Sequence, residues 1–233
     1  RLLVLGSPRS GTSLLAAMLG RHSQIAMTHE DTGDAWTRVV GKPVTGVKLV
    51  TPNQIELEHT WRAKGRRCLR RVQRYGVQNL GLSLPRFKLR SVFSIRDFLA
   101  WPSGRIIGIL RNPQEAVASI RRRGGHVAGE AMYRWRRGVE ILAYLRRAHP
   151  ARTCVVHYDH LVRAPETCVA RCLDWLGLPD EPGLVVGNTI NYGSGAIDAS
   201  KASQDGDACF DHPVFEEQPH LRVAYRRLLD DAA

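Results

Sequence analysis

The sequence lacks several features that would place it in a specialised class of protein. It has no run of eighteen apolar residues, so nothing in the 233-residue chain is predicted to span a membrane. Its five cysteines are scattered and odd in number, which argues against a disulfide framework. Cys168 and Cys172 lie one helical turn apart, but no second pair of metal-binding side chains follows them. We therefore expect both to pack in a core and expect no structural metal.

Acidic residues are too few to balance the basic ones. The chain has 34 Lys and Arg against 22 Asp and Glu, a formal net charge of +12, and arginine supplies most of the excess. Such a surface attracts polyanions, anionic cofactors or membrane head groups without indicating which. Hydrophobic residues make up 43% of the chain, an ordinary value for a globular protein. Length and composition together predict a single domain over residues 1–233.

Short apolar runs alternate with helical segments over most of the chain. Strands are predicted at residues 2–5, 24–28, 44–50, 105–110 and 152–158, and helices at 12–22, 61–74, 94–100, 113–123, 130–148, 165–178 and 219–230. Asn112 and Pro113 form a favourable helix start, and Gly177 a helix end. The alternation predicts an α/β fold of three layers, with a central parallel sheet flanked by helices.

Four arginines recur at every fourth position of the predicted helix at 61–74, namely Arg62, Arg66, Arg70 and Arg74. This spacing places them in one stripe on one helical face. The stripe is either an ordinary solvated surface or an anion-binding one. A non-catalytic polyanion-binding module is the hypothesis in which it would dominate, although no nucleic-acid motif accompanies it and no nucleic-acid partner is expected.

The stretch LGSPRSGTSLL has the form of a phosphate-binding loop without its lysine. A nucleoside-triphosphate loop reads G-x-x-x-x-G-K-[ST], but here Thr12 occupies the lysine position and Arg9 lies inside the loop. Strand, glycine loop and helix still make an anion site of the P-loop NTPase-like kind. The planar guanidinium of Arg9 suits a phosphate or sulfate. Because strand 105–110 is followed by Arg111 and not by a metal-binding aspartate, a degenerate P-loop kinase is the weaker alternative.

Two stretches carry a resemblance to one family. GSPRSGTSLLAAML resembles the 5′-phosphosulfate loop of sulfotransferases that use 3′-phosphoadenosine 5′-phosphosulfate (PAPS), and RIIGILRNPQEAVASIRRR is similar to the family's second signature. A third stretch, VVHYDHLVRAPETCVARCLDWLGLP, looks like the strand and helix that close the family's sheet. The resemblance implies a 5′-phosphosulfate site made by Arg9, Ser10, Gly11, Thr12 and Ser13, and a 3′-phosphate site made by Arg111 and Ser119. The expected product is 3′-phosphoadenosine 5′-phosphate (PAP).

Candidate catalytic residues lie just after the second predicted strand and near the end of the third. The stretch from Pro8 to Glu30 resembles that of tyrosylprotein sulfotransferases, whose catalytic glutamate falls at the position of Glu30. His29 is the rival base, because cytosolic sulfotransferases use a histidine, although theirs lies elsewhere in the chain. Lys48 resembles a strand-end lysine that contacts the sulfuryl group in relatives; otherwise it faces outward from an edge strand.

Two parts of the sequence, the residue after the phosphate-binding loop and the C-terminal region, indicate which branch of the sulfotransferase family the chain resembles. GAIDASK is similar to the loop that covers the nucleotide, which implies contacts from Ser200 and Lys201. The aromatic residue and the terminal R-K-G-x-x-G-D-W-K segment of cytosolic sulfotransferases are absent, and Leu14 stands in the first of these places. The chain therefore sits nearer the bacterial and Golgi-type branches. Its compartment stays open: cytoplasmic for a bacterial protein, the Golgi lumen if an upstream anchor has been removed.

These observations predict one reaction. We expect in-line transfer of a sulfuryl group, without a metal, to a hydroxyl or amine acceptor whose identity the sequence leaves open. A basic surface favours an acidic acceptor, although the polyanionic donor accounts for part of that charge.

Overall fold

The computed structural model describes residues 1–30, 41–58, 93–124, 127–185, 197, 202, 210 and 212–232. The arginine stripe at 61–74 and the predicted nucleotide-covering residues Ser200 and Lys201 lie outside these residues.

A five-stranded parallel sheet forms the centre of the molecule. Its strands run in the order β2 (Ile25–His29), β3 (Val44–Val50), β1 (Leu2–Gly6), β6 (Arg105–Leu110) and β7 (Thr153–His157). Every neighbouring pair is parallel, as the alternating sequence pattern predicted. Parallel strands bring their carboxyl ends to one edge of the sheet, which is where open α/β sheets bind ligands. The loop after β1 and the residues after β2, β3 and β6 therefore meet at this edge.

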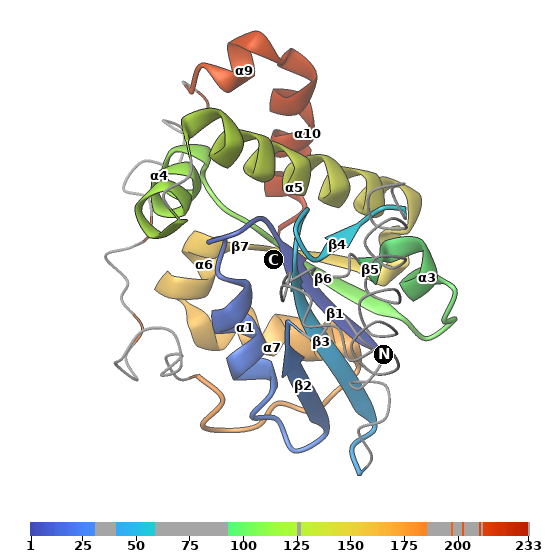
Figure 1. Ribbon diagram of the computed structural model, residues 1–233. Coiled ribbons are helices and arrows are strands. Elements are labelled where there is room, and N and C mark those ends of the chain that lie inside the picture. Colours follow the sequence, from blue (N-terminus) through green and yellow to red (C-terminus); the bar gives the residue numbers. More distant parts are fainter. Residues whose placement is uncertain are drawn as a thin grey trace, which may run out of the picture.

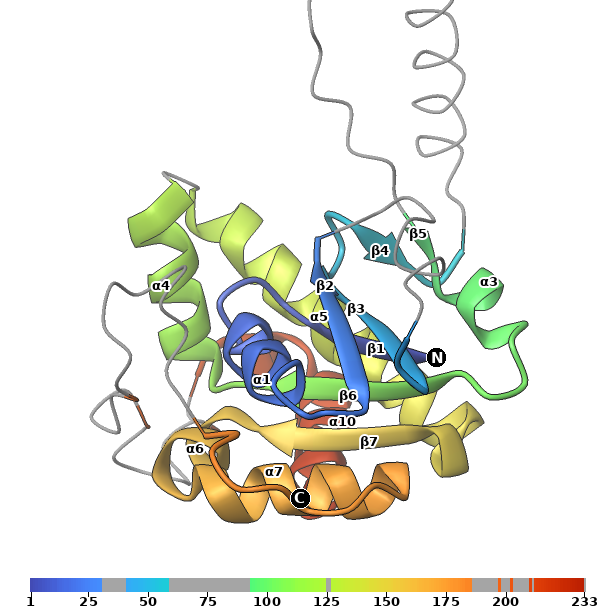
Figure 2. The ribbon, with the colours of Figure 1, turned by 90° about the horizontal axis from the view of Figure 1, so that it is seen from below.

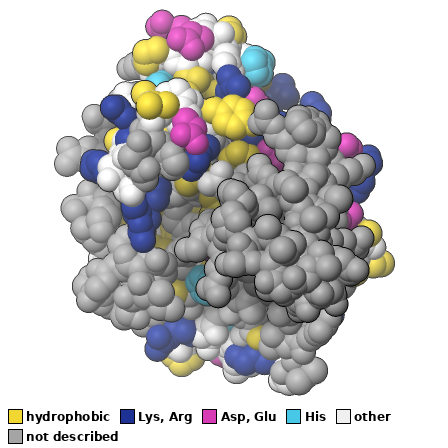
Figure 3. Space-filling view, viewed as in Figure 1, with side chains coloured by type: hydrophobic (Ala, Val, Ile, Leu, Met, Phe, Trp, Pro, Cys, Tyr) yellow, Lys and Arg dark blue, Asp and Glu magenta, His cyan; other side chains and the backbone are white. Residues whose placement is uncertain are grey.

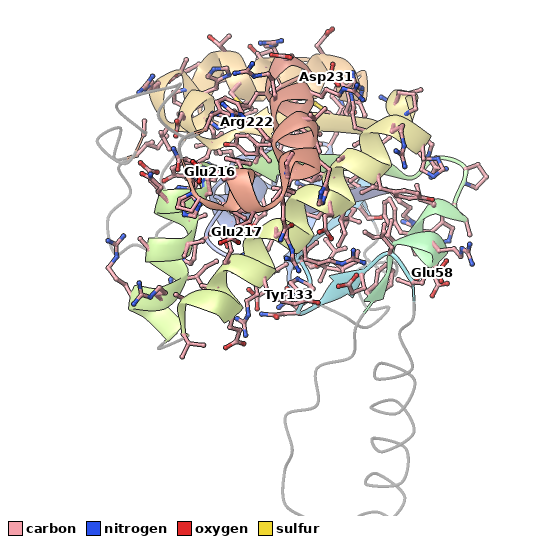
Figure 4. The ribbon with its side chains drawn as sticks, turned by 90° about the horizontal axis from the view of Figure 1, so that it is seen from above. Glu58, Tyr133, Glu216, Glu217, Arg222 and Asp231 are labelled. Carbon is pink, nitrogen blue, oxygen red and sulfur yellow. The ribbon has the colours of Figure 1, made fainter. Side chains whose placement is uncertain are left out.

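Helices cover both faces of the sheet, which gives three layers (Figure 1). One face carries α1 (Thr12–Leu19), α6 (Tyr158–Arg163) and α7 (Pro165–Leu176). Figure 2 shows α6 and α7 lying along the β7 side of the sheet. The other face carries α5 (Ala128–Ala148), on which α4 (Pro113–Gly124) and α10 (Pro219–Asp230) pack. Figure 4 shows α10 crossing α5, with Asp231 at its end, where the carboxylate pairs with Arg146 at 3.0 Å.

Smaller elements complete the described chain. Two short parallel strands, β4 (Ile55–Glu56) and β5 (Phe93–Ser94), form a separate ribbon followed by α3 (Ile95–Leu99). A 3₁₀ turn, η2 (Pro150–Arg152), precedes β7, and α9 (Val214–Glu217) precedes α10. None of the described helices is both long and apolar enough to cross a bilayer.

The apolar run of β1 is explained by burial on both faces. Leu3 and Leu5 pack in one cluster with α5 and α10, whereas Leu2 and Val4 pack in a second cluster with α1 and α7. Strands buried on both faces are apolar throughout, so the sequence shows no alternation there. Cys168 and Cys172 lie buried in the second cluster, as the apolar helix predicted.

Several local predictions are confirmed at residue level. The apolar residues that recur every three or four positions along the predicted helix at 130–148 are buried in α5, namely Trp135, Val139, Leu142 and Leu145. The Asn112 side chain accepts a hydrogen bond from the Gln114 backbone N–H at 2.8 Å at the start of α4. Gly177 ends α7 in the left-handed conformation with φ 73°. The sequence missed five small elements of the described chain, namely β4, β5, η2, α9 and α6, the last of which begins at Tyr158 where a strand was expected to continue.

Candidate active site

The loop between β1 and α1 is shaped by close backbone contacts. A Cβ on Gly6 would lie 2.5 Å from the Ser10 hydroxyl oxygen and 2.7 Å from the Ile109 carbonyl oxygen, so only glycine fits. Arg9 and Gly11 have left-handed backbones with φ of 68° and 97°. The Ser10 N–H and hydroxyl both donate to the Ser7 carbonyl, at 3.3 and 2.8 Å. Ser10 is fully buried and shapes the loop from inside, away from the cavity described next.

The loop opens onto a cavity of about 260 Å³. Its lining consists of Pro8, Arg9, Gly11, Thr12, Ser13, Glu30, Lys48, Val50, Asn53, Gln54 and Arg123. The first turn of α1 has neither a side-chain cap nor an acidic residue, so the positive end of the helix is not neutralised from within the turn. Six of the predicted site residues, Arg9, Gly11, Thr12, Ser13, Glu30 and Lys48, are brought together here.

Glu30 is held from two sides at the wall of this cavity. The Lys48 ammonium donates to Glu30 Oε1 at 2.8 Å, and the Gln54 amide nitrogen donates to Glu30 Oε2 at 2.7 Å. The Glu30 backbone is left-handed, with φ 55°, and its N–H donates to the Lys48 carbonyl at 2.9 Å. The Glu30 side chain nevertheless remains 43% exposed, so a ligand in the cavity can reach its carboxylate.

Lys48 does not lie on an edge strand. β3 is paired on one side with β2 and on the other with β1, and Lys48 is 3% exposed. The expectation of an outward-facing surface lysine is therefore wrong for this residue. A buried ammonium requires a partner, and Glu30 supplies it.

His29 lies beside Lys48 but outside the cavity lining. The two residues are register partners in the β2–β3 pair. Burial, and then the Lys48 ammonium, lower the pKa of His29, against the opposing effect of Glu30. The lowered pKa favours the neutral ring, but the structure does not bring His29 into the described lining of the cavity that holds Glu30.

The second predicted anion site adjoins the first. The Arg111 guanidinium donates to the Arg9 carbonyl at 2.9 Å and to Glu115 at 2.9 Å, and it lies 4.0 Å from the centre of the Tyr158 ring. The Ser119 hydroxyl accepts from Arg9 Nε at 3.1 Å. Arg9 thus contacts both residues predicted to hold the 3′-phosphate. Arg111 and Ser119 themselves stand next to the cavity and are not part of its described lining.

Four residues near the site escaped sequence reasoning: Gln54, Asn53, Arg123 and Tyr158. Arg123 lies four residues after Ser119, so the helical spacing could have placed both on one face. Tyr158 packs against Gly11, where a Cβ would lie 2.5 Å from its ring, and its position at the end of a predicted strand was a signal. Gln54 and Asn53 follow a turn after β3, and no local pattern marks them.

Basic side chains gather at the α4 end of the site. Arg121, Arg122 and Arg123 occupy the last turn of this helix. Figure 3 shows Lys and Arg side chains clustered in the part of the view where α4 lies. Part of the net charge of +12 is therefore concentrated beside the cavity.

The sequence comparison decides the family. The model of the sulfotransferase family matches residues 2–182, more than half of the chain. The chain belongs to the sulfotransferase family. Within this family it is 24% identical over 235 aligned positions to protein-tyrosine sulfotransferase 1 of Danio rerio, across 88% of this chain and 61% of the zebrafish protein. It thus spans about three fifths of the length of that relative.

Solved sulfotransferase structures share the fold. The sulfotransferase domain from the curacin biosynthetic pathway superposes with a TM-score of 0.54 at 16% identity, covering 98% of this chain and 95% of that one. A mouse sulfotransferase complexed with PAP superposes with a TM-score of 0.53 at 12% identity, covering 99% and 88%. The predicted three-layer α/β fold is therefore confirmed, and at this level of identity the likeness concerns the fold alone.

Proposed function

We propose that the chain is a PAPS-dependent sulfotransferase acting as one domain over residues 1–233. One observation carries the proposal: among the described residues, three cationic side chains, Arg9, Lys48 and Arg123, line one cavity at the start of α1 with one carboxylate, Glu30. Three positive charges against one negative charge favour an anionic ligand. The carboxylate beside them supplies a base for an acceptor that carries a proton.

The donor is assigned to the two adjoining anion sites. The loop from Arg9 to Ser13 would hold the 5′-phosphosulfate, with Ser10 contributing through loop shape, and Arg111 with Ser119 would hold the 3′-phosphate. The contact between Arg9 and Ser119 at 3.1 Å supports one ligand spanning both sites. The mouse structure complexed with PAP supports this choice of nucleotide. Contacts from Ser200 and Lys201 belong to the same proposal.

Glu30 is the proposed base. Its carboxylate takes the proton of the acceptor hydroxyl or amine while the acceptor atom bonds to sulfur on the side opposite the leaving oxygen. The bond from sulfur to that phosphate oxygen breaks, and its electron pair leaves with PAP. Lys48, aided by Arg9, stabilises the negative charge on the sulfuryl and leaving oxygens. His29 is the weaker choice because it does not line the cavity.

Side chains supply the positive charge that a metal ion provides in P-loop kinases. The residue that follows β6 is Arg111, so this strand end carries a guanidinium. Lys48 and Arg9 already line the cavity. These cations support a transfer that needs no metal.

The acceptor is proposed as a hydroxyl or amine. The zebrafish relative is named a protein-tyrosine sulfotransferase, so tyrosine hydroxyls enter the set of acceptors to be tried first. The arginines at the end of α4 favour acceptors with acidic groups near the reacting hydroxyl.

Two measurements test the proposal. Calorimetry should detect binding of PAP that Arg9→Ala weakens at least about tenfold, by loss of a charged contact, and that Arg21→Ala leaves unchanged, because Arg21 is exposed at the end of α1. Radiolabelled PAPS should then label members of a panel of tyrosine peptides, phenols and amines. Absence of PAP binding overturns the proposal.

A larger thermal stabilisation by ATP and magnesium than by PAP would favour the kinase alternative. Salt-sensitive heparin binding that ignores Arg9→Ala, without PAP binding, would favour a polyanion-binding module.

A further inference from the structure

Gln54 makes a set of hydrogen bonds that fixes its side-chain amide. Its Oε1 accepts from the Val50 backbone N–H at 2.8 Å, and its Nε2 donates to Glu30 Oε2 at 2.7 Å. The Gln54 backbone N–H donates to the Val50 carbonyl at 2.8 Å, and its carbonyl accepts from the Phe93 N–H at 2.6 Å. The residue is 2% exposed, so water has little access to these bonds.

These contacts leave one orientation for the amide. A backbone N–H can only donate, so the oxygen of the Gln54 amide must face Val50. The NH₂ group must then face Glu30, whose carboxylate oxygen accepts. The orientation follows from the chain itself and does not depend on how the two amide atoms are assigned.

We propose that Gln54 is the positioning residue for the Glu30 carboxylate. This inference rests on the proposed function, in which Glu30 is the base. The left-handed backbone of Glu30, with φ 55°, is a conformation that a non-glycine residue keeps only when its surroundings hold it. Gln54 and Lys48 grip one carboxylate oxygen each and thereby set the direction in which the base faces the cavity.

Lys48 and Gln54 respond differently to an anion in the cavity. Among the described residues, the titratable groups around Glu30 are Lys48 from β3, Arg9 from the loop and Arg123 from α4, which line the same cavity, and His29, the last residue of β2. An anion in the cavity competes with Glu30 for the Lys48 ammonium. The Gln54 amide carries no charge and already donates to Glu30 Oε2, so the anion attracts it less strongly than it attracts the Lys48 ammonium. Gln54 therefore keeps the carboxylate in place while Lys48 turns to the donor.

One substitution separates this role from a structural one. Gln54→Glu keeps an oxygen for the Val50 N–H but replaces the donor to Glu30 with a second carboxylate, at a position now 2.7 Å from Glu30 Oε2. Two carboxylates this close share a proton, so one of them stays protonated to higher pH. Gln54→Leu removes both contacts. Gln218→Glu, the same change at the start of α10 and outside the cavity lining, is the matched control.

Carboxyl-carbon NMR of protein labelled at the glutamate side chain reads the effect without any ligand. The Glu30 signal is identified by its loss in Glu30→Gln. We expect Gln54→Glu to raise the midpoint of the Glu30 titration by about one pH unit or more, as a neighbouring like charge does. Gln218→Glu should leave the midpoint unchanged. A change below about 0.3 pH unit in Gln54→Glu, less than close carboxylates produce, overturns the inference.

Kinetics with radiolabelled PAPS then separate the possible failures. We expect Gln54→Leu to lower kcat roughly tenfold, the effect of losing one charge-assisted hydrogen bond, with the KM for PAPS little changed. If Glu30→Gln keeps full activity, Glu30 is not the base, and the proposed role of Gln54 in positioning it is wrong as well. If Glu30→Gln is inactive while both Gln54 variants keep the parental kcat and pH profile, only the inference about Gln54 is wrong.

Discussion

The ion pair between Lys48 and Glu30 can be broken by replacing either residue, and we expect the two replacements to lower the free energy of unfolding by different amounts. The Lys48 ammonium lies 2.8 Å from Glu30 Oε1, and the side chains are 4% and 43% exposed, respectively. Lys48→Met removes the buried charge, while Glu30 keeps its hydrogen bond from the Gln54 amide and its exposure to water. Glu30→Ala instead leaves an ammonium buried in β3 without the carboxylate that neutralises it.

The exposure of the Lys48 and Glu30 side chains determines how much each substitution changes the free energy of unfolding. Because Glu30 is more than a third exposed, solvent screens its side of the pair, and we expect Lys48→Met to change the free energy of unfolding by at most about 1 kcal/mol. A buried charge left without its partner costs about 3–5 kcal/mol. The cavity beside Lys48 admits some water, so we expect Glu30→Ala to lower the free energy of unfolding by roughly 2–3 kcal/mol.

Urea denaturation at neutral pH measures both changes. The matched control is the pair between Arg96 and Glu58, whose side chains are 78% and 66% exposed at 3.2 Å. Figure 4 shows Glu58 on the outside of the molecule beside α3. Because both ends of this pair lie in water, Arg96→Met and Glu58→Ala should agree within about 0.5 kcal/mol. Equal losses for Lys48→Met and Glu30→Ala, or a larger loss for Lys48→Met, would refute the assignment of Lys48 as the buried end.

Three further substitutions test other parts of the structure. Gly11→Ala should lower the free energy of unfolding by about 1–3 kcal/mol, because φ at Gly11 is +97° and the added carbon would lie 2.5 Å from the Tyr158 ring. The control Gly129→Ala should cause no such loss, because open space surrounds that position. Trp135→Phe should cost about 1–2 kcal/mol in urea denaturation and weaken PAP binding, because the indole N–H donates to the Arg111 carbonyl at 2.8 Å. Burial lowers the pKa of His157 below its usual 6.5, and its effect outweighs the opposing charge of Asp159. As the pH falls below 6.5, the His157 side chain is therefore protonated more readily in the unfolded chain than in the folded one, and the free energy of unfolding decreases. His157→Phe should flatten the dependence of the melting temperature on pH between neutral and mildly acidic solution.

The sequence predicted those elements whose signals are local. Asn112 and Pro113 mark the start of α4, Gly177 marks the end of α7, and the closing helix has the predicted bounds Pro219–Asp230. The elements it missed are too short to show a period: β4 has two residues and α9 has four. α6 begins directly at the end of β7, so the apolar run of the strand conceals the change at Tyr158.

The sequence pointed to a residue beside the cavity most directly where that residue belongs to a motif of adjacent residues. Arg9 and Gly11 belong to a loop whose chemistry can be read from adjacent residues, and Arg111 follows a clear strand. Glu30 and Lys48 came from resemblance, and the contact between them depends on the β2–β3 register, which places His29 opposite Lys48. Gln54 depends on how the chain turns back after β3, and that turn is fixed by tertiary contacts such as the bond from Phe93 to its carbonyl.

The missing loop lysine has a structural counterpart on another strand. Thr12 stands where a triphosphate loop carries its lysine, and it is 4% exposed at the start of α1. The ammonium in this cavity comes instead from Lys48, in the strand hydrogen-bonded to β1. Lys48 is paired with Glu30 at 2.8 Å. The cation on β3 is therefore paired with the proposed base, so an anion that binds Lys48 competes with Glu30 for the ammonium while Gln54 still holds the carboxylate.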